Sequence, residues 1–400
     1  NTTASFNTAV GSDALGQNTT GGDNTAIGKN ALESNTTGGH NTAVGKDALG
    51  TNTTGAQNTA IGRYALQNNQ TASGNTAMGY ASLISDTTGY DNTAHGQNCL
   101  YNNTTGLSNT GIGKNALLTN TTASQNTAVG SGALYTSTTS DNVALGFNSA
   151  YSQTTGSNTL AIGRNALFAN TTGIQNVAVG NYALDAVTTS NYNVGVGYAS
   201  LSSVTTGERN TGIGRSSGSA LTTGSYGVFL GYNTRPSGAS SDFVTAIGYN
   251  VEGAAEYTTI GKSSSDIRAL HGNATWATVS DERYKKDIEH STAGLDFVND
   301  LKPRTFNYRN KGDLPTTFAA YEKDSTETYK NSETNHGFIA QEVKAAIDAH
   351  PDIKNGFRMW DSRDDGSQEV SEAAVIPILV KAIQELSTEV NILKEKLNGK

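Results

Sequence analysis

The sequence predicts a mostly β repeat shaft, either a single-chain β-solenoid or a three-chain β-roll, followed by an α+β domain that ends in a coiled-coil helix. Three observations lead to this fold class: a 17-residue repeat, a change of composition near residue 280, and an apolar stripe near the C-terminus. Residues 1–279 hold 39 of the 45 glycines, whereas residues 280–400 hold 39 of the 62 charged residues. We therefore place the shaft at 1–249, a neck or linker at 250–279 and the C-terminal domain at 280–400.

The repeat unit is a short strand closed by glycine, then an Ala-Leu pair, then an Asn-Thr-Thr-Gly turn. The closing glycines follow at steps of 17 residues, apart from one step of 16 and a shorter last step: Gly11, Gly28, Gly45, Gly62, Gly79, Gly96, Gly113, Gly130, Gly146, Gly163, Gly180, Gly197, Gly214, Gly231, Gly248 and Gly261. One unit buries too little apolar surface to be stable alone, so neighbouring units must stack.

The side chains of each short strand alternate between two faces. From this alternation we expect one inward ladder of Val10, Ile27, Val44, Ile61 and Met78, and a second inward ladder of leucines (Leu15, Leu32, Leu49 and Leu66). The Asn- and Thr-rich segments predict a soluble outer face with Asn and Thr ladders that stabilise stacking. The alternative interpretation of these faces is a binding surface for glycans.

The composition also bears on partners. The net charge is −8 and no dense Lys/Arg stripe is present, which argues against a nucleic-acid partner. No apolar run is long enough to span a bilayer, so we expect no membrane partner. Cys99 is the only cysteine, so no intrachain disulfide can form. No cluster of His, Cys or carboxylates has metal-ligand spacing, and we expect neither a metal nor a cofactor.

The C-terminal domain opens with Ser280 and Asp281, and Lys285 follows five residues after the serine. A serine beside a desolvated lysine can perform acyl chemistry, with the lysine as general base. By spacing alone, a polar linker that enters a charged helix explains the segment equally well. Lys286 is a competing candidate for the base.

Two later motifs strengthen the catalytic interpretation. Leu-Lys-Pro-Arg-Thr-Phe-Asn-Tyr occupies residues 301–308, and Gly-Phe-Ile-Ala-Gln-Glu-Val occupies residues 337–343. With the Ser-Asp opening and the terminal helix, residues 280–400 resemble the intramolecular chaperone domain of phage tailspikes and fibres, the S74 peptidase family first recognised in endosialidases.

The resemblance implies an intramolecular serine endopeptidase with a Ser-Lys dyad. Ser280 would be the nucleophile and Lys285 its base, and the chain would be cut once between Val279 and Ser280, with no turnover of external substrate. Asp281 belongs to the family's opening, and His336 could assist proton transfer but is better explained as structural. The serine hydroxyl already lies next to the peptide that it would attack, so proximity is supplied.

Residues 375–398 predict a coiled-coil helix. Their apolar residues step by three and four over three full heptads: Ile376, Leu379, Ile383, Leu386, Val390, Leu393 and Leu397. Glu385, Glu389, Lys394, Glu395 and Lys396 leave this seam narrow. The alternative is one amphipathic helix that lies on its own domain. The number of strands cannot be read from the mixed Ile and Leu pattern, and a homotrimer is implied by the resemblance.

These features predict a structural fibre of a phage tail, located in the virion, that contacts a host cell-surface glycan or protein. The alternative is a bacterial or other cell-surface adhesin fibre with the same autoprocessing domain. A glycan-degrading tailspike is disfavoured because the repeat offers no paired acids in a constant setting. Its carboxylates fall at different repeat positions, as Asp13, Asp23, Glu33 and Asp47 do.

Overall fold

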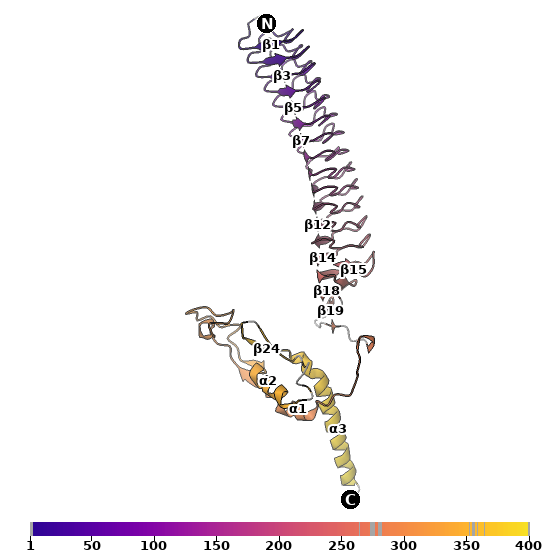
Figure 1. Ribbon diagram of the computed structural model, residues 1–400, viewed down its shortest axis with the longest axis vertical. Helices are drawn as coiled ribbons and strands as arrows, with labels where there is room; N and C mark the ends of the chain where they lie inside the picture. Colours follow the sequence, from indigo (N-terminus) through magenta and orange to yellow (C-terminus); the bar gives the residue numbers. More distant parts are fainter. Residues whose placement is uncertain are drawn as a thin grey trace. The chain divides into compact units, whose positions relative to one another are not determined.

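The computed structural model describes residues 3–263, 265–272, 277–278, 282–351, 353, 357, 359–363 and 365–398, without the side chains of residues 277, 278 and 284. The chain divides into two compact units, Asn1–Ser280 and Asp281–Lys400. Figure 1 shows the first as a stack of turns and the second as a smaller α/β unit with a long C-terminal helix.

The N-terminal unit is a single-chain β-solenoid. One short strand recurs in every turn (Figure 1): β1 (Thr8–Val10), β2 (Thr25–Ile27), β3 (Thr42–Val44), β4 (Thr59–Ile61), β5 (Thr76–Met78), β6 (Thr93–His95), β7 (Thr110–Ile112), β8 (Thr127–Val129), β9 (Val143–Leu145), β10 (Leu160–Ile162), β11 (Val177–Val179), β12 (Val194–Val196), β13 (Thr211–Ile213), β14 (Val228–Tyr232), β16 (Thr245–Tyr249) and β18 (Tyr257–Lys262).

Each of these strands pairs in parallel with the next strand of the same chain, for example Thr8 with Thr25 and Val10 with Ile27. The single 16-residue step of the repeat lies between β8 and β9, where Thr127 pairs with Val143. The pairing confirms the predicted 17-residue repeat, and among the two architectures that the sequence leaves open it selects the single-chain solenoid over the intertwined roll.

The closing glycine of each turn is required by close approach of the backbone. Gly113 has φ +131°, and a Cβ atom there would lie 2.6 Å from the carbonyl of Gly130 in the next turn. No larger residue fits at that distance without displacing the backbone. The 17-residue spacing of glycines therefore follows from the stacking itself.

The interior of the solenoid is narrow and takes only small or regularly repeated side chains. The leucine ladder is confirmed: Leu32, Leu49 and Leu66 are fully buried. The other predicted inward ladder is wrong, because Val10 and Ile27 are 58% and 41% exposed while the middle alanine of the strand, such as Ala26, is buried. Alternation along the strand is as expected, but the inner wall accepts the small residue and the bulky ones face outward.

Asparagine ladders run through the interior rather than over the outer surface. Asn35 Nδ2 donates to Asn18 Oδ1 at 2.8 Å, and Asn52 Nδ2 donates to Asn35 Oδ1 at 2.8 Å. These ladders confirm the predicted role of Asn in stacking and correct its location, because Asn18, Asn35 and Asn52 are buried. A buried amide is stable only when its donors and acceptors are satisfied, and the neighbouring turns provide the partners.

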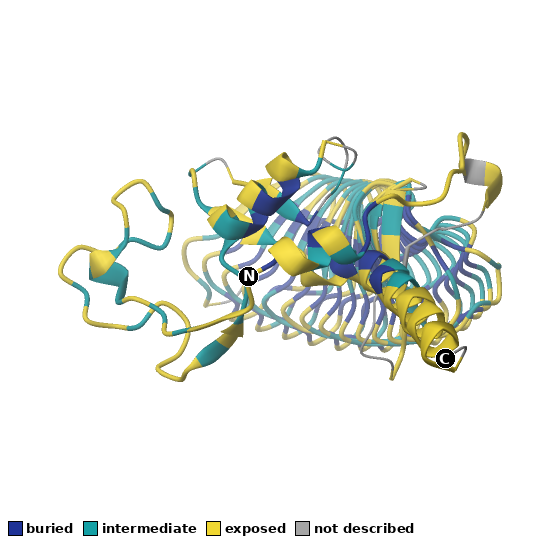
Figure 2. Ribbon diagram, turned by 90° about the horizontal axis from the view of Figure 1, so that it is seen from below, coloured by how far each residue is buried: buried dark blue, intermediate teal, exposed yellow. Residues whose placement is uncertain are grey.

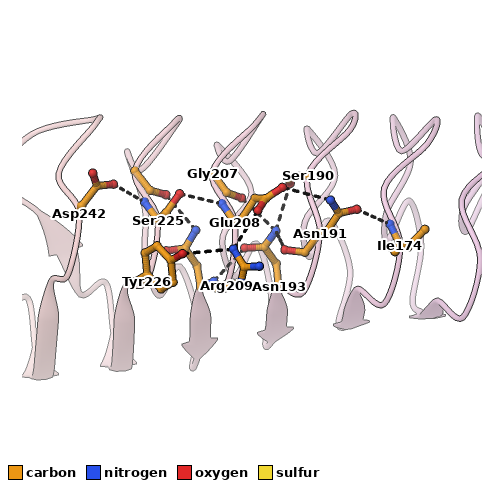
Figure 3. A network of polar contacts seen from close by, with 12 residues as sticks. Ile174, Ser190, Asn191, Asn193, Gly207, Glu208, Arg209, Ser225, Tyr226 and Asp242 are labelled. Atoms are coloured by element: carbon orange, nitrogen blue, oxygen red, sulfur yellow. Dashed lines mark hydrogen bonds and ion pairs between the residues drawn. The ribbon is translucent and has the colours of Figure 1, made fainter.

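The threonine ladder of the Asn-Thr-Thr-Gly turn lies at the surface. Thr19 Oγ1 donates to the carbonyl of Thr36 at 2.9 Å, and Thr104 Oγ1 donates to the carbonyl of Thr121 at 3.1 Å. A second polar network joins outer turns further along the shaft (Figure 3), where Asn191 accepts from the Ile174 N–H and Asp242 accepts from the Ser225 N–H. Both sets connect one turn to the next.

The C-terminal end of the shaft departs from the regular turn. β15 (Arg235–Pro236) pairs in parallel with β17 (Glu252–Gly253). The segment that the sequence marks as a neck contains β18, which continues the parallel ladder. β18 then pairs in antiparallel orientation with β19 (Ser265–Leu270), and β19 with β20 (Ala277–Thr278).

The C-terminal unit has three α-helices, α1 (Leu295–Asp300), α2 (Ala340–Ala349) and α3 (Ile376–Asn398), among its described residues. Two small antiparallel sheets join β21 (Arg304–Phe306) to β22 (Asn335–Gly337) and β23 (Trp360–Ser362) to β24 (Gln368–Val370). Short 3-10 helices are η1 (Glu282–Tyr284), η2 (Lys311–Asp313) and η3 (Glu372–Val375). The core is built from larger side chains than the shaft's: Ala293, Phe297, Leu301, Val343, Ala346, Ile347, Met359, Val375 and Ile378.

Candidate functional site

The predicted scissile bond between Val279 and Ser280 lies outside the described residues, as does Asp281. Lys285 is described and follows η1 directly. Its backbone N–H donates to the carbonyl of Glu282 at 2.9 Å, and the residue is exposed. The Ser280–Lys285 pair therefore stays a prediction.

Lys286, the competing base, is an exposed surface residue. Its side chain is 93% exposed, and its Nζ lies 4.0 Å from Asp287 Oδ2. A general-base lysine needs desolvation, and Lys285 is exposed as well, so exposure does not separate the two candidates. Lys286 thus serves as a matched control for Lys285.

The two sequence motifs of the C-terminal domain meet in space. β21 from the first motif pairs with β22, which leads into the second motif, so that Arg304 lies opposite Gly337. Arg304 Nε and Nη2 donate to the two carboxylate oxygens of Glu342 at 2.9 and 2.6 Å. This bidentate pair lowers the pKa of Glu342 and raises that of Arg304, in each case first through the side-chain hydrogen bond. Spacing alone did not predict the pair.

His336 lies on β22 opposite Thr305 and is exposed. It lines a groove together with Arg304 and Glu372. The groove is narrow at Gly337, where a Cβ atom would lie 3.0 Å from Glu372 Oε1. His336 is thus placed next to the motif contact, with its relation to Ser280 outside the described residues.

The first half of α3 is docked on the C-terminal unit. Ile378 and Ala382 are buried. Glu385 Oε2 accepts a hydrogen bond from the Leu295 N–H at 2.7 Å, at the start of α1, and its Oε1 lies 3.2 Å from Lys381 Nζ. The Leu295 hydrogen bond is the main reason that the pKa of Glu385 is lowered. α3 therefore belongs partly to the core of its own unit.

The predicted coiled-coil seam lies on a neighbouring face of α3. All seven of its residues are exposed by 38–78%: Ile376, Leu379, Ile383, Leu386, Val390, Leu393 and Leu397. Figure 2 shows the C-terminal half of the helix as exposed. The helix thus has one face on its own domain and an apolar seam left without a partner within the described part of the chain, and the coiled coil stays a prediction.

The position directly after the closing glycine is a cation or an aromatic residue in most turns of the shaft. Arg215 lies between the rings of Tyr198 and Tyr232, at 5.8 and 5.5 Å from their centres. Tyr232 in turn stacks on Tyr249, with ring centres 5.1 Å apart. We call these residues, with Lys29, Lys46, Arg63, Tyr80, Lys114, Phe147, Arg164 and Lys262, the cation–aromatic edge.

The described residues also bear on other types of site. None of the helices described is both long and apolar enough to cross a bilayer. Nor does any group of three or more His, Cys, Asp or Glu side chains in that part of the chain converge as metal ligands would.

Comparison with known families gives one match. Residues 280–350 match the family model of the chaperone of endosialidase, Peptidase S74. No curated protein and no solved structure matches the chain. The matched segment begins at the predicted nucleophile and contains the paired β21 and β22 motifs. Residues 280–350 are therefore similar to the endosialidase chaperone family, and they follow a β-solenoid of the kind that fits a tail fibre or tailspike.

Proposed function

We propose that this chain is a homotrimeric tail-fibre protein of a phage whose C-terminal chaperone directs folding of the shaft and then cleaves itself off before Ser280. The observation that carries the proposal is the family match at residues 280–350, directly after a repetitive solenoid. A repetitive shaft has weakly specified register, because a shift by one turn preserves most contacts. A folding template at one end supplies a fixed starting register.

The proposed chemistry uses groups of this chain only, together with water. Ser280 Oγ attacks the carbonyl carbon of Val279 while Lys285 Nζ accepts the hydroxyl proton. The C–N bond to Ser280 breaks, and the proton passes to the departing amine. Water then hydrolyses the resulting ester, which frees the carboxylate of Val279 and restores the Ser280 hydroxyl. The two fragments are residues 1–279 and 280–400.

Trimer formation is supported by α3. Its apolar seam is continuous over three heptads and exposed, although a neighbouring face of the same helix is docked. A stripe of this kind is stabilised by packing against copies of itself. Assembly through the seam would also bring three chaperone units together before cleavage.

Contact with a host surface, in the virion, is supported by the cation–aromatic edge. Exposed aromatic rings stack on sugar faces, and arginine binds acidic groups. Tyr198 is 50% exposed and lies beside Arg215. Binding of the fibre to an array of bacterial envelope glycans should fall at least tenfold in a Tyr198→Ala, Arg215→Ala variant. Unchanged binding would remove this edge from the proposal.

The experiment that tests the proposal is a denaturing gel of purified wild type beside Ser280→Ala, Lys285→Ala and the control Lys286→Ala. We expect wild type and the Lys286→Ala control to give two fragments, the smaller starting at Ser280 by mass, while the other two variants stay whole. A folded wild type that stays whole would overturn the autoprocessing proposal. Cleavage that fails in Lys286→Ala but persists in Lys285→Ala would assign the base to Lys286.

A further inference from the structure

The outer face of the shaft sheet carries a continuous row of bulky side chains. We call the third residue of each strand from β1 to β14 and of β16, together with Ile260 of β18 that pairs with Ile247, the outer row: Val10, Ile27, Val44, Ile61, Met78, His95, Ile112, Val129, Leu145, Ile162, Val179, Val196, Ile213, Leu230, Ile247 and Ile260. None of these side chains is buried. The exposed fraction reaches 58% at Val10 and 46% at Ile213.

From β1 to β13 this face contains no formally charged side chain. In these three-residue strands the two outward positions are the outer row and the first residue, which is Thr, Val or Leu in all thirteen. His95 is the only titratable residue at either position. The neighbouring cation–aromatic edge, by contrast, carries a Lys or Arg in seven turns. The same turns therefore carry charged side chains at the cation–aromatic edge and none on this sheet face.

The interior of the solenoid does not require the outer row. The middle residue of the strand, such as Ala178 or Ala161, fills the interior and is fully buried. An outward Thr or Lys would leave that packing unchanged. Apolar side chains repeated along a flat, exposed face instead indicate a surface that a partner covers.

The apolar face widens along the shaft. The first strand residue is Thr from β1 to β8, but it is Val143, Leu160, Val177 and Val194 from β9 to β12. Each of these is half-buried. Two apolar rows therefore run side by side over these four strands.

We propose that this face is where copies of the same chain associate, outer row against outer row around a common axis. The inference rests on the proposed homotrimeric fibre and names its contact along the shaft. The strands repeat about every 4.8 Å, and a second copy in register presents the same spacing over the whole length. The exposed seam of α3 is an independent apolar surface that fits the same occupant.

The size of the face is sufficient for a stable contact. The outer row alone exposes on the order of 1,000 Å², and a standard interface buries about 800 Å² per partner. The core of such an interface is depleted in charge, as the outer row is. The same outer-row residue of two copies would meet across the axis. Cross-linking between copies through a single introduced cysteine is therefore a direct test.

The test places single cysteines on the full chain, kept uncleaved by Ser280→Ala. Val196→Cys lies in the outer row, and the control Thr189→Cys is exposed in the Val-Thr-Thr-Ser segment (187–190), which takes the place of the Asn-Thr-Thr-Gly turn there. The native Cys99 does not compete, because it is buried and burial raises the pKa of its thiol to about 12. Under mild oxidation we expect Val196→Cys to form disulfide-linked dimers at least tenfold faster than Thr189→Cys. Equal rates, or faster linkage of Thr189→Cys, would overturn the inference.

A third variant, Leu393→Cys on the α3 seam, separates this inference from the proposed trimer. Cross-linking at Leu393→Cys without cross-linking at Val196→Cys would remove the shaft contact and leave the trimer standing. No cross-linking at either position in a protein that sediments as a monomer would remove both.

A charge variant gives a readout without cysteine chemistry. Val179→Lys, Val196→Lys and Ile213→Lys together should make the cleaved shaft sediment as a monomer, since like charges would face one another across the axis. The matched control is Thr172→Lys, Thr189→Lys and Thr206→Lys, which adds the same charge to exposed positions of the same region. Loss of the oligomer in the control alone, or in neither variant, would contradict the proposal.

Discussion

The two units of this chain are stabilised in different ways. In the shaft, each turn contacts the next through identical small side chains and amide ladders, such as that of Asn18, Asn35 and Asn52. In the C-terminal unit, contacts join segments far apart in the sequence, such as the hydrogen bond from the Leu295 N–H to Glu385. The shaft is a one-dimensional stack, whereas the C-terminal unit is a globule with a single core.

The difference explains why the two are found together. The repeated contacts of the shaft together contribute much stability. They specify the register only weakly, because a shift by one turn replaces most contacts with equivalent ones. Unique contacts, such as the packing of Phe297 against Phe357 and His350, specify one arrangement. A chain that needs a long uniform shaft therefore benefits from a unit of unique structure that fixes where stacking begins.

The largest effect is expected in the core of the C-terminal unit. Phe297 is fully buried, and Phe297→Ala should destabilise this unit by about 3–5 kcal/mol, because it leaves a cavity in a small core. Urea unfolding followed by circular dichroism measures the loss. We also expect less cleavage before Ser280 and more aggregated shaft.

The matched control is Tyr329→Ala, a 38% exposed aromatic of the same unit, which should leave cleavage and assembly near wild type. A Phe297→Ala protein with a normally assembled shaft would show that the shaft fixes its own register.

A core substitution in the shaft should act locally instead. Leu117 is fully buried between Leu100 and Leu134 of the adjacent turns. Leu117→Ala is expected to cost about 2–5 kcal/mol, with the loss confined to neighbouring turns because each turn contacts only the next. Hydrogen exchange read by mass spectrometry should show lower protection near β7 and unchanged protection near β2 and β12. Uniform loss along the shaft would contradict the one-dimensional description.

A smaller effect is expected at the single carboxylate of the inner amide ladder. Asp86 takes the place of Asn and is fully buried. It accepts from Asn103 Nδ2 at 2.9 Å, but it has no N–H to give to Asn69, whose Oδ1 has no partner in the described structure. Burial is the main cause that raises the pKa of Asp86 to about 7, against hydrogen bonds from Asn103 and the Gly89 N–H.

Because the folded pKa is higher than the ordinary value of 3.8, the folded shaft binds the proton more tightly than the unfolded chain does. Stability should therefore fall as pH rises from about 4 to about 7, by at most about 4 kcal/mol. Asp86→Asn should abolish this slope and stabilise the shaft at pH 8, since its amide donates to Asn69. Unfolding midpoints of both proteins at pH 5 and pH 8 measure the effect, and parallel pH profiles would refute it.

The smallest effect is expected at the exposed contact between the two motifs. Arg304→Ala removes the bidentate pair with Glu342 and should lower the melting temperature only slightly, since exposed ion pairs contribute little. Arg304→Lys retains the charge but loses the planar geometry. If the contact positions the motifs for cleavage, both variants will cleave more slowly than wild type at equal stability. Equal cleavage rates would make the pair purely structural.

Much of the shaft could be predicted from its sequence. The glycine spacing gives the turn length because a Cβ at Gly113 would meet the next turn. The leucine ladder also follows from the repeat. The repeat does not predict which face of the strand points inward, because alternation is the same whether Ala26 or Ile27 does so. Only the width of the interior decides between them.

The same limit applies to the C-terminal unit. The period of its apolar residues predicts α3 and its seam, since both are local properties. The Arg304–Glu342 pair and the hydrogen bond between Leu295 and Glu385 join residues 38 and 90 positions apart. Such contacts depend on tertiary packing, which no local pattern specifies.

The most direct test of the central claim is a refolding comparison between the cleaved shaft, residues 1–279, and the uncleaved Ser280→Ala chain. Both are unfolded in denaturant and diluted into buffer, and recovery of the assembled β-solenoid is followed by circular dichroism and sedimentation. We expect the uncleaved chain to recover its assembly and the cleaved shaft to fail, because the unit that fixes its register has been removed. Equal recovery of both would contradict the claim that the C-terminal unit directs folding of the shaft.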